Sequence, residues 1–268
     1  MNKQAPIGIF DSGIGGLTLA SAVHELLPNE QLVYFGDTAH LPYGDKSTAA
    51  IQAYSIKICN VLLNQGVKLI LIACNSASAS AYDLVKAYVG SRAIVMNVID
   101  PLVDYVAEKH SNKKIGLIGT KRTINSNIYK SKIDAKNSNI NLSSIATPLL
   151  APMIEEGFFE NNISHQIIGR YLEHEELTDL DALILGCTHY PLIKKEIQNF
   201  YNTSTEVIDS SEIVAKSLKK RLIESDLLSE RLENKHHFFV SDFTNSFQKA
   251  TEQFFGKKIS LELYKLWE

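Results

Sequence analysis

Two cysteines in this 268-residue sequence follow apolar runs that resemble each other. Cys74 comes after residues 69–73, LILIA, and Cys187 comes after residues 182–186, ALILG. Runs of this length and composition are typical of strands that are buried on both faces of a parallel sheet. Open parallel sheets bind ligands beyond the carboxyl ends of their strands, so we expect both thiols where chemistry takes place.

Four kinds of chemistry are open to such a pair of thiols. A catalytic or regulatory disulfide is the first, although no C-x-x-C pair is present to tune it. A zinc site is the second, with both cysteines, His189 and either Asp11 or water as ligands, but this spacing is not a usual metal-binding pattern. A cysteine hydrolase would pair Cys187 with His189 and leave Cys74 without a role. In the fourth, one thiol removes a proton from a carbon atom and the other delivers a proton to the opposite face.

The elements that would position these thiols begin with a strand, a glycine-rich turn and a helix. Residues 7–10 form a short apolar run, residues 11–16 read DSGIGG, and residues 17–27 alternate at helical spacing. This is the opening unit of a doubly wound α/β fold. The turn lacks the full G-x-G-x-x-G spacing, so it supports a dinucleotide site only weakly. Asp11 and Ser12 stand just past the strand end and are candidate site residues.

Strands and helices alternate along the rest of the chain. Further strands are expected at residues 31–36, 93–98, 142–145, 207–210 and 236–241. Helices are expected from a cap at Ser47 to residue 65, and at residues 77–89, 164–172 and 211–228. A charged loop is expected at residues 229–235, followed by a helix and a strand within residues 244–268.

The chain also has the appearance of an internal duplication. The segment that starts at Ile115 is similar in sequence to the one that starts at Ile7, 108 residues earlier. Cys187 follows Cys74 by a similar distance, 113 residues. Chance similarity between strand–turn–helix units is the alternative explanation. The pattern predicts an α/β protein with two pseudo-symmetric doubly wound domains, mostly parallel sheets and an active site in the inter-domain cleft.

Composition excludes several other classes of protein. A hydrophobic content of 45% is enough for real cores, and a net charge of −3 gives no reason to expect nucleic acid or an acidic membrane as a partner. No apolar run approaches the roughly 20 residues of a membrane span, and no signal-peptide core is visible. The three cysteines are too few for a disulfide framework or a structural zinc site, so we expect a cytoplasmic protein.

Several segments of the sequence resemble the glutamate racemase family. The resemblance covers nearly the whole chain and follows the order of the family's motifs. Ser76 departs slightly from the family, because many members have threonine there, but the hydroxyl is kept. The segments that carry the resemblance are DSGIGG (residues 11–16), YFGDTA (34–39), LPYG (41–44), CNSA (74–77) and GCTHYPL (186–192).

The resemblance implies a cofactor-independent enzyme that interconverts L- and D-glutamate. Because no metal spacing or lysine-centred cofactor motif appears at the strand ends, we expect that it needs neither a metal nor pyridoxal phosphate. It implies that Cys74 and Cys187 are the acid/base groups, that Asp11 assists Cys74, and that His189 assists Cys187 with possible help from Glu155. The substrate contacts that it implies are Asp11, Ser12, Tyr43, Gly44, Asn75, Ser76, Thr188 and His189.

The resemblance also implies an organisation and a role for the protein. Together with the repeat offset, it predicts a first domain from residues 1–97 plus 207–268 and a second from residues 98–206. It implies a homodimer whose product, D-glutamate, supplies peptidoglycan synthesis.

Three other functions remain open from the sequence. A racemase of the same superfamily could act on another acid such as aspartate. A Cys–His hydrolase would retain much of its activity when Cys74 is replaced, whereas the racemase needs both thiols. An amino-acid-binding protein would bind glutamate without changing it.

Overall fold

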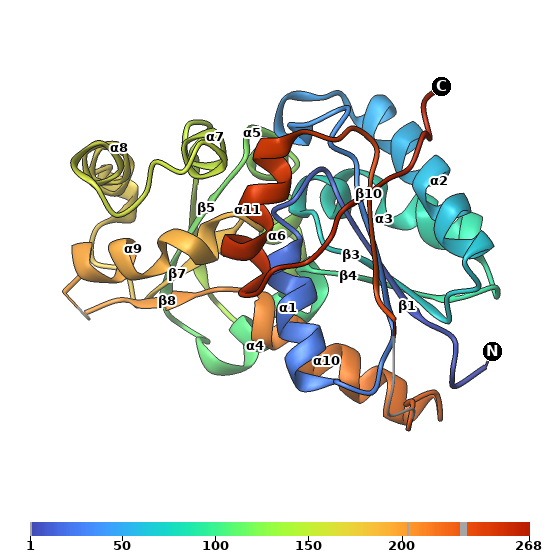
Figure 1. Ribbon diagram of the computed structural model, residues 1–268. Helices are drawn as coiled ribbons and strands as arrows, with labels where there is room; N and C mark the ends of the chain where they lie inside the picture. Colours follow the sequence, from blue (N-terminus) through green and yellow to red (C-terminus); the bar gives the residue numbers. More distant parts are fainter. Residues whose placement is uncertain (1, 203, 231–234) are drawn as a thin grey trace.

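The computed structural model describes residues 2–202, 204–230 and 235–268, whose strands form two separate sheets. Every pair of neighbouring strands in both sheets is parallel. Helices flank both sheets, as Figure 1 shows. The α/β class predicted from the sequence is therefore confirmed.

The first sheet has six strands in the order β10-β9-β2-β1-β3-β4. Its strands are β1 (Ile7–Asp11), β2 (Leu32–Gly36), β3 (Leu69–Ile72), β4 (Ile94–Asn97), β9 (His237–Val240) and β10 (Glu262–Leu263). The central strands β1, β2 and β3 are buried at every position. Burial on both faces explains why their sequences are uninterrupted apolar runs rather than alternating ones.

The second sheet has four strands in the order β6-β5-β7-β8. They are β5 (Lys114–Gly119), β6 (Asn141–Ala146), β7 (Ala182–Gly186) and β8 (Glu206–Ile208). Strand β8 pairs with β7 as far as Ile208, so the second sheet extends two residues past the expected end of the second domain at residue 206.

The two sheets repeat one topology. The order β2-β1-β3-β4 in the first sheet corresponds to β6-β5-β7-β8 in the second. Strands β3 and β7, which lead to Cys74 and Cys187, take the same place in this order. The pseudo-symmetry predicted from the sequence is confirmed, and it puts both cysteines beyond the carboxyl ends of equivalent strands.

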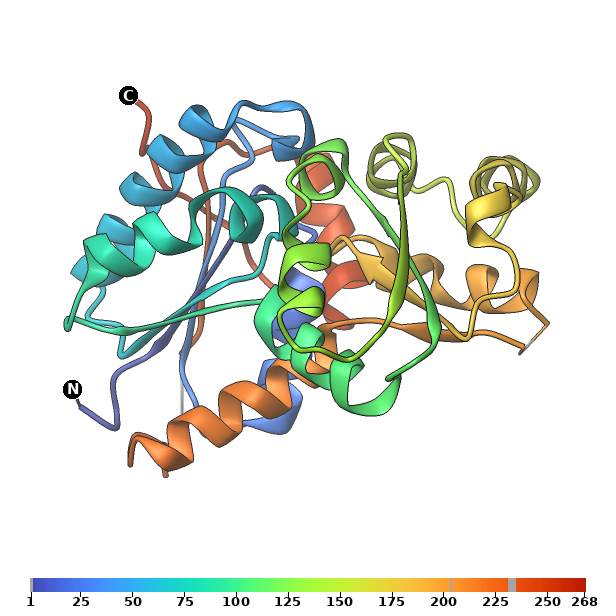
Figure 2. The ribbon, with the colours of Figure 1, turned by 180° about the vertical axis from the view of Figure 1, so that it is seen from behind.

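The two sheets and the helices around them form two lobes, which Figure 2 shows from behind. The lobes share a continuous core, because one cluster of buried side chains includes Leu71 of the first sheet and Ile184 of the second. Helix α1 packs against α10 and α11, and α10 packs against α4. The helices are α1 (Leu17–Leu26), α2 (Thr48–Asn64), α3 (Asn75–Val89), α4 (Ile99–Lys109), α5 (Lys121–Asn125), α6 (Ile128–Asp134), α7 (Leu150–Glu155), α8 (Asn162–Leu172), α9 (Lys194–Phe200), α10 (Ser211–Glu224) and α11 (Asn245–Phe255).

Most element boundaries agree with the sequence pattern to within a few residues. Ser47 caps α2, since its side-chain oxygen accepts a hydrogen bond from the backbone N–H of Ala50. Helix α3 begins at Asn75, two residues earlier than expected, because Cys74 serves as its cap. Helix α10 ends four residues before the expected Leu228. Within the loop expected at residues 229–235, residues 231–234 lie outside the described part of the chain.

A buried ion pair fastens the connection between α10 and β9 to the first sheet. The Nζ atom of Lys68 lies 2.6 Å from Oε2 of Glu30, and both side chains are almost completely buried. The same ammonium donates to the carbonyl oxygens of Lys3 and Leu227. Glu30 also accepts a hydrogen bond from the backbone N–H of Ser229. These bonds hold the returning chain where it can add β9 and β10 to the sheet.

Candidate active site

Cys74 lies where β3 passes into α3. Its Sγ atom accepts a hydrogen bond from the backbone N–H of Ala77 at 3.5 Å, so the thiol caps the helix. The same sulfur lies 3.7 Å from the hydroxyl oxygen of Ser12, which follows β1. Strands β1 and β3 are neighbours in the sheet, which explains how residues 62 positions apart meet.

Cys187 belongs to a chain of three side chains in the second lobe. Its Sγ atom lies 3.6 Å from Nδ1 of His189, and Nε2 of His189 lies 2.8 Å from Oε1 of Glu155. Phe254 of α11 contacts the imidazole ring edge-on, with centroids 5.4 Å apart. The carboxylate and the aromatic ring hold the imidazole so that its other nitrogen faces the sulfur.

Both cysteines line one cavity between the lobes, which we call the interlobe cavity. Its volume is about 30 Å³. The first lobe contributes Ser12, Pro42, Tyr43, Gly44, Cys74, Asn75 and Ser76. The second lobe contributes Thr120, Ala151, Pro152, Glu155, Cys187, Thr188 and His189. The structure thus brings together every site residue named from the sequence except Asp11.

Asp11 lies behind the cavity wall and is completely buried. Its Oδ2 atom accepts a hydrogen bond from the backbone N–H of Gly13. Burial raises the pKa of the Asp11 carboxyl, and the charge of His189 and backbone N–H groups partly oppose this shift. A carboxyl that binds a proton more readily than usual is suited to proton exchange with a neighbouring thiol.

The two thiols differ in their electrostatic surroundings. Burial, and to a lesser extent the negative charge of Asp11, raises the pKa of the Cys74 thiol to about 12. Burial alone would lower the pKa of His189, but hydrogen bonds to Cys187 and Glu155 and the charges of both partners raise it well above its ordinary value. The site therefore favours a neutral thiol at Cys74 and a cationic imidazole beside Cys187.

Two buried polar atoms near the cavity have no hydrogen-bond partner in the described structure. They are the acceptor Oδ1 of Asp11 and the donor Nδ2 of Asn75. Tyr129 fixes the Asn75 amide, because its hydroxyl donates to Oδ1 of Asn75 at 2.7 Å and leaves the amide NH₂ group free. An unpaired buried donor or acceptor costs free energy, which a ligand that supplies the missing partner would recover.

The lobes meet closely beside His189. A Cβ atom on Gly15 would lie 2.7 Å from the side-chain oxygen of Thr188 and closer still to the imidazole ring. The Oγ1 atom of Thr18 donates a hydrogen bond to the carbonyl oxygen of Thr188 at 3.0 Å. Because Gly15 has no Cβ atom, the glycine-rich turn of the first lobe can contact Thr188 and His189 of the second lobe.

The sequence did not single out several residues that shape this site. Thr120 lines the cavity, and the echo between the two halves could have indicated it, because Thr120 follows β5 as Ser12 follows β1. Pro42, Ala151 and Pro152 also line the cavity. No local sequence pattern indicates the role of Tyr129, because a tyrosine within a helix does not reveal that its hydroxyl bonds to Asn75.

A cavity of about 30 Å³ has room for one or two water molecules. An amino acid needs more space than this, so we expect the lobes or their loops to move apart when one enters. Closure around the ligand would exclude water and strengthen every electrostatic interaction inside.

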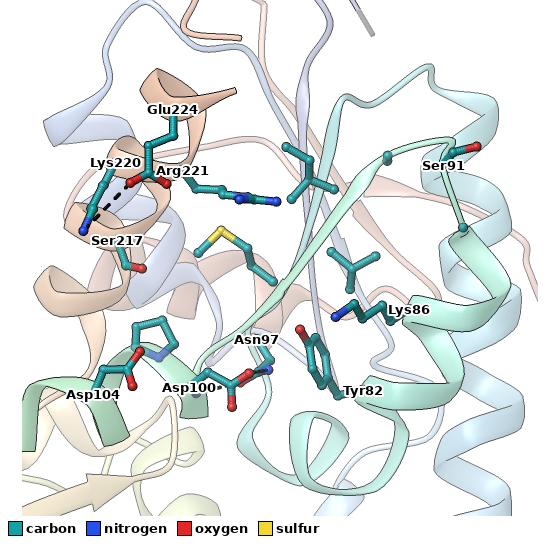
Figure 3. A pocket seen from close by; sticks show the side chains of 16 residues that line it. Tyr82, Lys86, Ser91, Asn97, Asp100, Asp104, Ser217, Lys220, Arg221 and Glu224 are labelled. Carbon is teal, nitrogen blue, oxygen red and sulfur yellow. Dashed lines mark hydrogen bonds and ion pairs between the residues drawn. The ribbon is translucent and has the colours of Figure 1, made fainter. Parts of the chain in front are cut away.

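A larger hollow lies elsewhere, along the exposed edge of β4. This groove of about 590 Å³ runs between β4, α3 and α10, and Figure 3 shows the side chains of Lys86 and Arg221 beside it. Its polar groups include an Asn97–Asp100 hydrogen bond. None of the described residues that line it is a cysteine or a histidine, so this groove holds neither of the two thiols singled out from the sequence.

The disulfide and zinc alternatives find no support in this arrangement. Cys59, Cys74 and Cys187 are all free thiols. Within residues 2–202, 204–230 and 235–268, no three histidine, cysteine, aspartate or glutamate side chains cluster as a metal site. In the same part of the chain, no helix is long and apolar enough to cross a membrane.

Comparison with known proteins gives the same class as the fold and site. Residues 17–218 match the family model of Asp/Glu/hydantoin racemases. A glutamate racemase from Chlorobium phaeobacteroides is 39% identical over 252 residues, which cover 94% of this chain and 92% of that protein.

Solved structures agree. The crystal structure of a Francisella tularensis glutamate racemase, in complex with D-glutamate, is 39% identical with a TM-score of 0.91 and 99% coverage of both chains. A Bacillus anthracis glutamate racemase is 32% identical with a TM-score of 0.93 and 98% coverage of both chains. The chain therefore belongs to the Asp/Glu/hydantoin racemase family, among its glutamate racemases, and is an isomerase.

Proposed function

We propose that this protein interconverts L- and D-glutamate by a two-thiol proton transfer that needs no cofactor or metal. The observation that carries the proposal is that Cys74 and Cys187, from equivalent places in two lobes, line one small cavity. The similarity to glutamate racemases over almost the whole chain supports glutamate as the substrate.

In the proposed reaction, the thiolate of one cysteine takes the α-proton and leaves the electron pair of the C–H bond on the substrate. The thiol of the other cysteine gives its proton to the opposite face of that carbon and becomes the new thiolate. By the resemblance, Cys74 deprotonates D-glutamate and Cys187 deprotonates L-glutamate. Asp11 would exchange protons with Cys74, and His189, held by Glu155, with Cys187.

The carbanion has no cofactor ring into which its charge can spread, so the site must stabilise it. The free amide of Asn75 and the backbone N–H groups at the start of α3 are donors suited to the substrate carboxylate. The free Oδ1 atom of Asp11 is an acceptor suited to the α-ammonium group. That ammonium would bring positive charge to Cys74 and favour its thiolate, which the site otherwise disfavours.

The proposed substrate contacts are those expected from the sequence. Seven of them line the interlobe cavity, and Asp11 lies behind them. The set is Asp11, Ser12, Tyr43, Gly44, Asn75, Ser76, Thr188 and His189.

We also propose two domains, made of residues 1–97 plus 207–268 and of residues 98–206. The membership of β9 and β10 in the first sheet supports this division, and the pairing of β8 favours moving the boundary just past Ile208.

A cytoplasmic homodimer that supplies D-glutamate for peptidoglycan synthesis is proposed on family resemblance. Light scattering of the purified protein would measure its oligomeric state.

The function is tested by circular dichroism of purified protein with D-glutamate, after dialysis against EDTA and with no added cofactor. We expect the signal to decay to zero as the racemate forms, and decay restored only by zinc would contradict the proposal. Cys74→Ala and Cys187→Ala should each abolish racemisation, whereas Cys59→Ala, at a buried position away from the cavity, should retain it.

Further measurements on the same variants separate the alternatives. A Cys–His hydrolase would keep much of its hydrolytic activity as Cys74→Ala. A binding protein would bind glutamate while the optical signal stayed constant. A chiral assay with aspartate alongside glutamate would reveal a racemase for another acid.

A further inference from the structure

Asp37 is a completely buried carboxylate that lies outside the interlobe cavity but contacts its wall. Its Oδ2 atom accepts a hydrogen bond from the hydroxyl of Tyr43 at 2.7 Å, and Tyr43 lines the cavity. Its Oδ1 atom accepts bonds from the Ser241 hydroxyl at 2.7 Å and the Trp267 indole N–H at 2.8 Å. Nδ1 of His40 lies 3.1 Å from Oδ2. Three of these four partners come from the loop after β2 or from the end of the chain.

Trp267 is the sole tryptophan of the sequence and is fixed from several sides. Its ring contacts His40 edge-on at a centroid distance of 4.4 Å and Tyr54 at 5.3 Å. The ammonium of Lys57 lies 4.8 Å from the ring centroid. Tyr54 and Lys57 belong to α2, and Figure 1 shows the last residues of the chain running from β10 past this helix. The indole is therefore clamped between α2 and the loop that carries Tyr43.

We infer that Trp267 is a positioning residue for the active site, and that it acts through Asp37 on Tyr43. A buried carboxylate needs its hydrogen-bond donors, so removal of the indole N–H leaves Oδ1 of Asp37 short of one partner. The carboxylate then turns toward the donors that remain, Ser241 and His40. This rotation moves the acceptor that holds the Tyr43 hydroxyl, and with it the wall of the interlobe cavity.

Tyr43 serves this network as a hydrogen-bond donor and not as an acid. Burial, followed by the charge of Asp37, raises the pKa of Tyr43 far above its ordinary value, so its hydroxyl keeps its proton. The consequence of moving Tyr43 should thus fall on substrate binding more than on proton transfer. This inference rests on the proposed racemase function, because it describes how one wall of that site is held.

The first test is steady-state kinetics of Trp267→Phe, which keeps a ring and removes the N–H. We expect KM for both enantiomers to rise about five- to tenfold while kcat stays within twofold. In a Tyr43→Phe background, the same change should alter KM less than twofold, because the hydroxyl that the network positions is already gone. Lys265→Ala, at an exposed position of the same segment, is the matched control and should match the parent.

The second test is hydrogen exchange followed by mass spectrometry, which does not depend on activity. Peptides that cover residues 37–46 should exchange at least threefold faster in Trp267→Phe, while those that cover β3 stay unchanged. If Trp267→Phe fails to fold, Ser241→Ala removes another donor to the same oxygen and should show the same pattern.

The outcomes distinguish the inference from the proposed function. A parent protein that does not racemise glutamate would refute the function and leave the exchange experiment to decide on Trp267. Equal KM increases in both backgrounds would overturn the inference, since Trp267 would then act by another route. Exchange that rises throughout the first sheet, or not at all, would overturn it as well.

Discussion

The side-chain oxygens of Ser76 and Thr120 lie 2.8 Å apart and join the two lobes by a hydrogen bond at the wall of the interlobe cavity. Ser76 lies in the first turn of α3, and Thr120 caps α5 in the second lobe. Both residues therefore stand at helix starts that follow strand ends. The bond lies on the side of the cavity that is formed by the starts of α3 and α5, just after strands β3 and β5.

Loss of this bond should weaken closure around the substrate. Thr120→Val keeps the shape of the side chain but removes its hydroxyl, and with it both the bond to Ser76 and the cap of α5. One neutral hydrogen bond contributes about 0.5–1.5 kcal/mol. We expect kcat/KM to fall about two- to tenfold. Thr120→Ser retains the hydroxyl and should recover most of the loss. Circular dichroism would measure kcat/KM for both variants. An equal fall in kcat/KM for Thr120→Ser and Thr120→Val would contradict this role of the hydroxyl.

Gly15→Ala should separate the lobes where they touch. The added Cβ would overlap the side chains of Thr188 and His189, so the imidazole that faces Cys187 must shift. Small misplacements of acid/base groups cost large factors in rate, so we expect activity to fall about 100-fold. Gly13→Ala is the matched control, because its Cβ would meet only Leu41 at 3.5 Å and should be tolerated. Equal activity of the two variants would show that the close contact at Gly15 is unimportant.

Glu155→Gln should change the pH profile of the enzyme. Removal of the carboxylate charge lowers the pKa of His189, since Glu155 is one of the groups that raise it. If catalysis uses the cationic imidazole, activity is lost as pH rises through that pKa. The alkaline limb of kcat/KM should therefore move to lower pH in Glu155→Gln. Glu156→Gln, an exposed neighbour, should leave the limb in place, and an unmoved limb in both variants would argue against this role for Glu155.

The sequence predicted the parts of this site that lie at strand ends. Cys74 and Cys187 could be placed because buried parallel strands are recognisable as apolar runs, and topology determines where such strands end. The similarity between the segments that start at Ile7 and Ile115 predicted two similar α/β halves for the same reason. These features depend on local pattern and on general rules of α/β folds.

Features that depend on distant contacts could not be predicted in this way. The bond between Tyr129 and Asn75 joins α6 to α3, and no spacing along the chain indicates it. The same holds for Trp267, which meets Asp37 from 230 residues away. The small volume of the cavity follows from how the lobes pack together, which is a property of side-chain shapes across the interface and not of any motif.

The central claim is that each enantiomer is deprotonated by one thiol and reprotonated by the other. The most direct test is racemisation in heavy water, with early-time mass analysis of each separated enantiomer and with Cys59→Ala as a control. We predict that product carries deuterium at its α-carbon from the first turnovers, while the remaining substrate gains much less. Product that keeps the α-proton of the substrate would contradict the two-thiol mechanism.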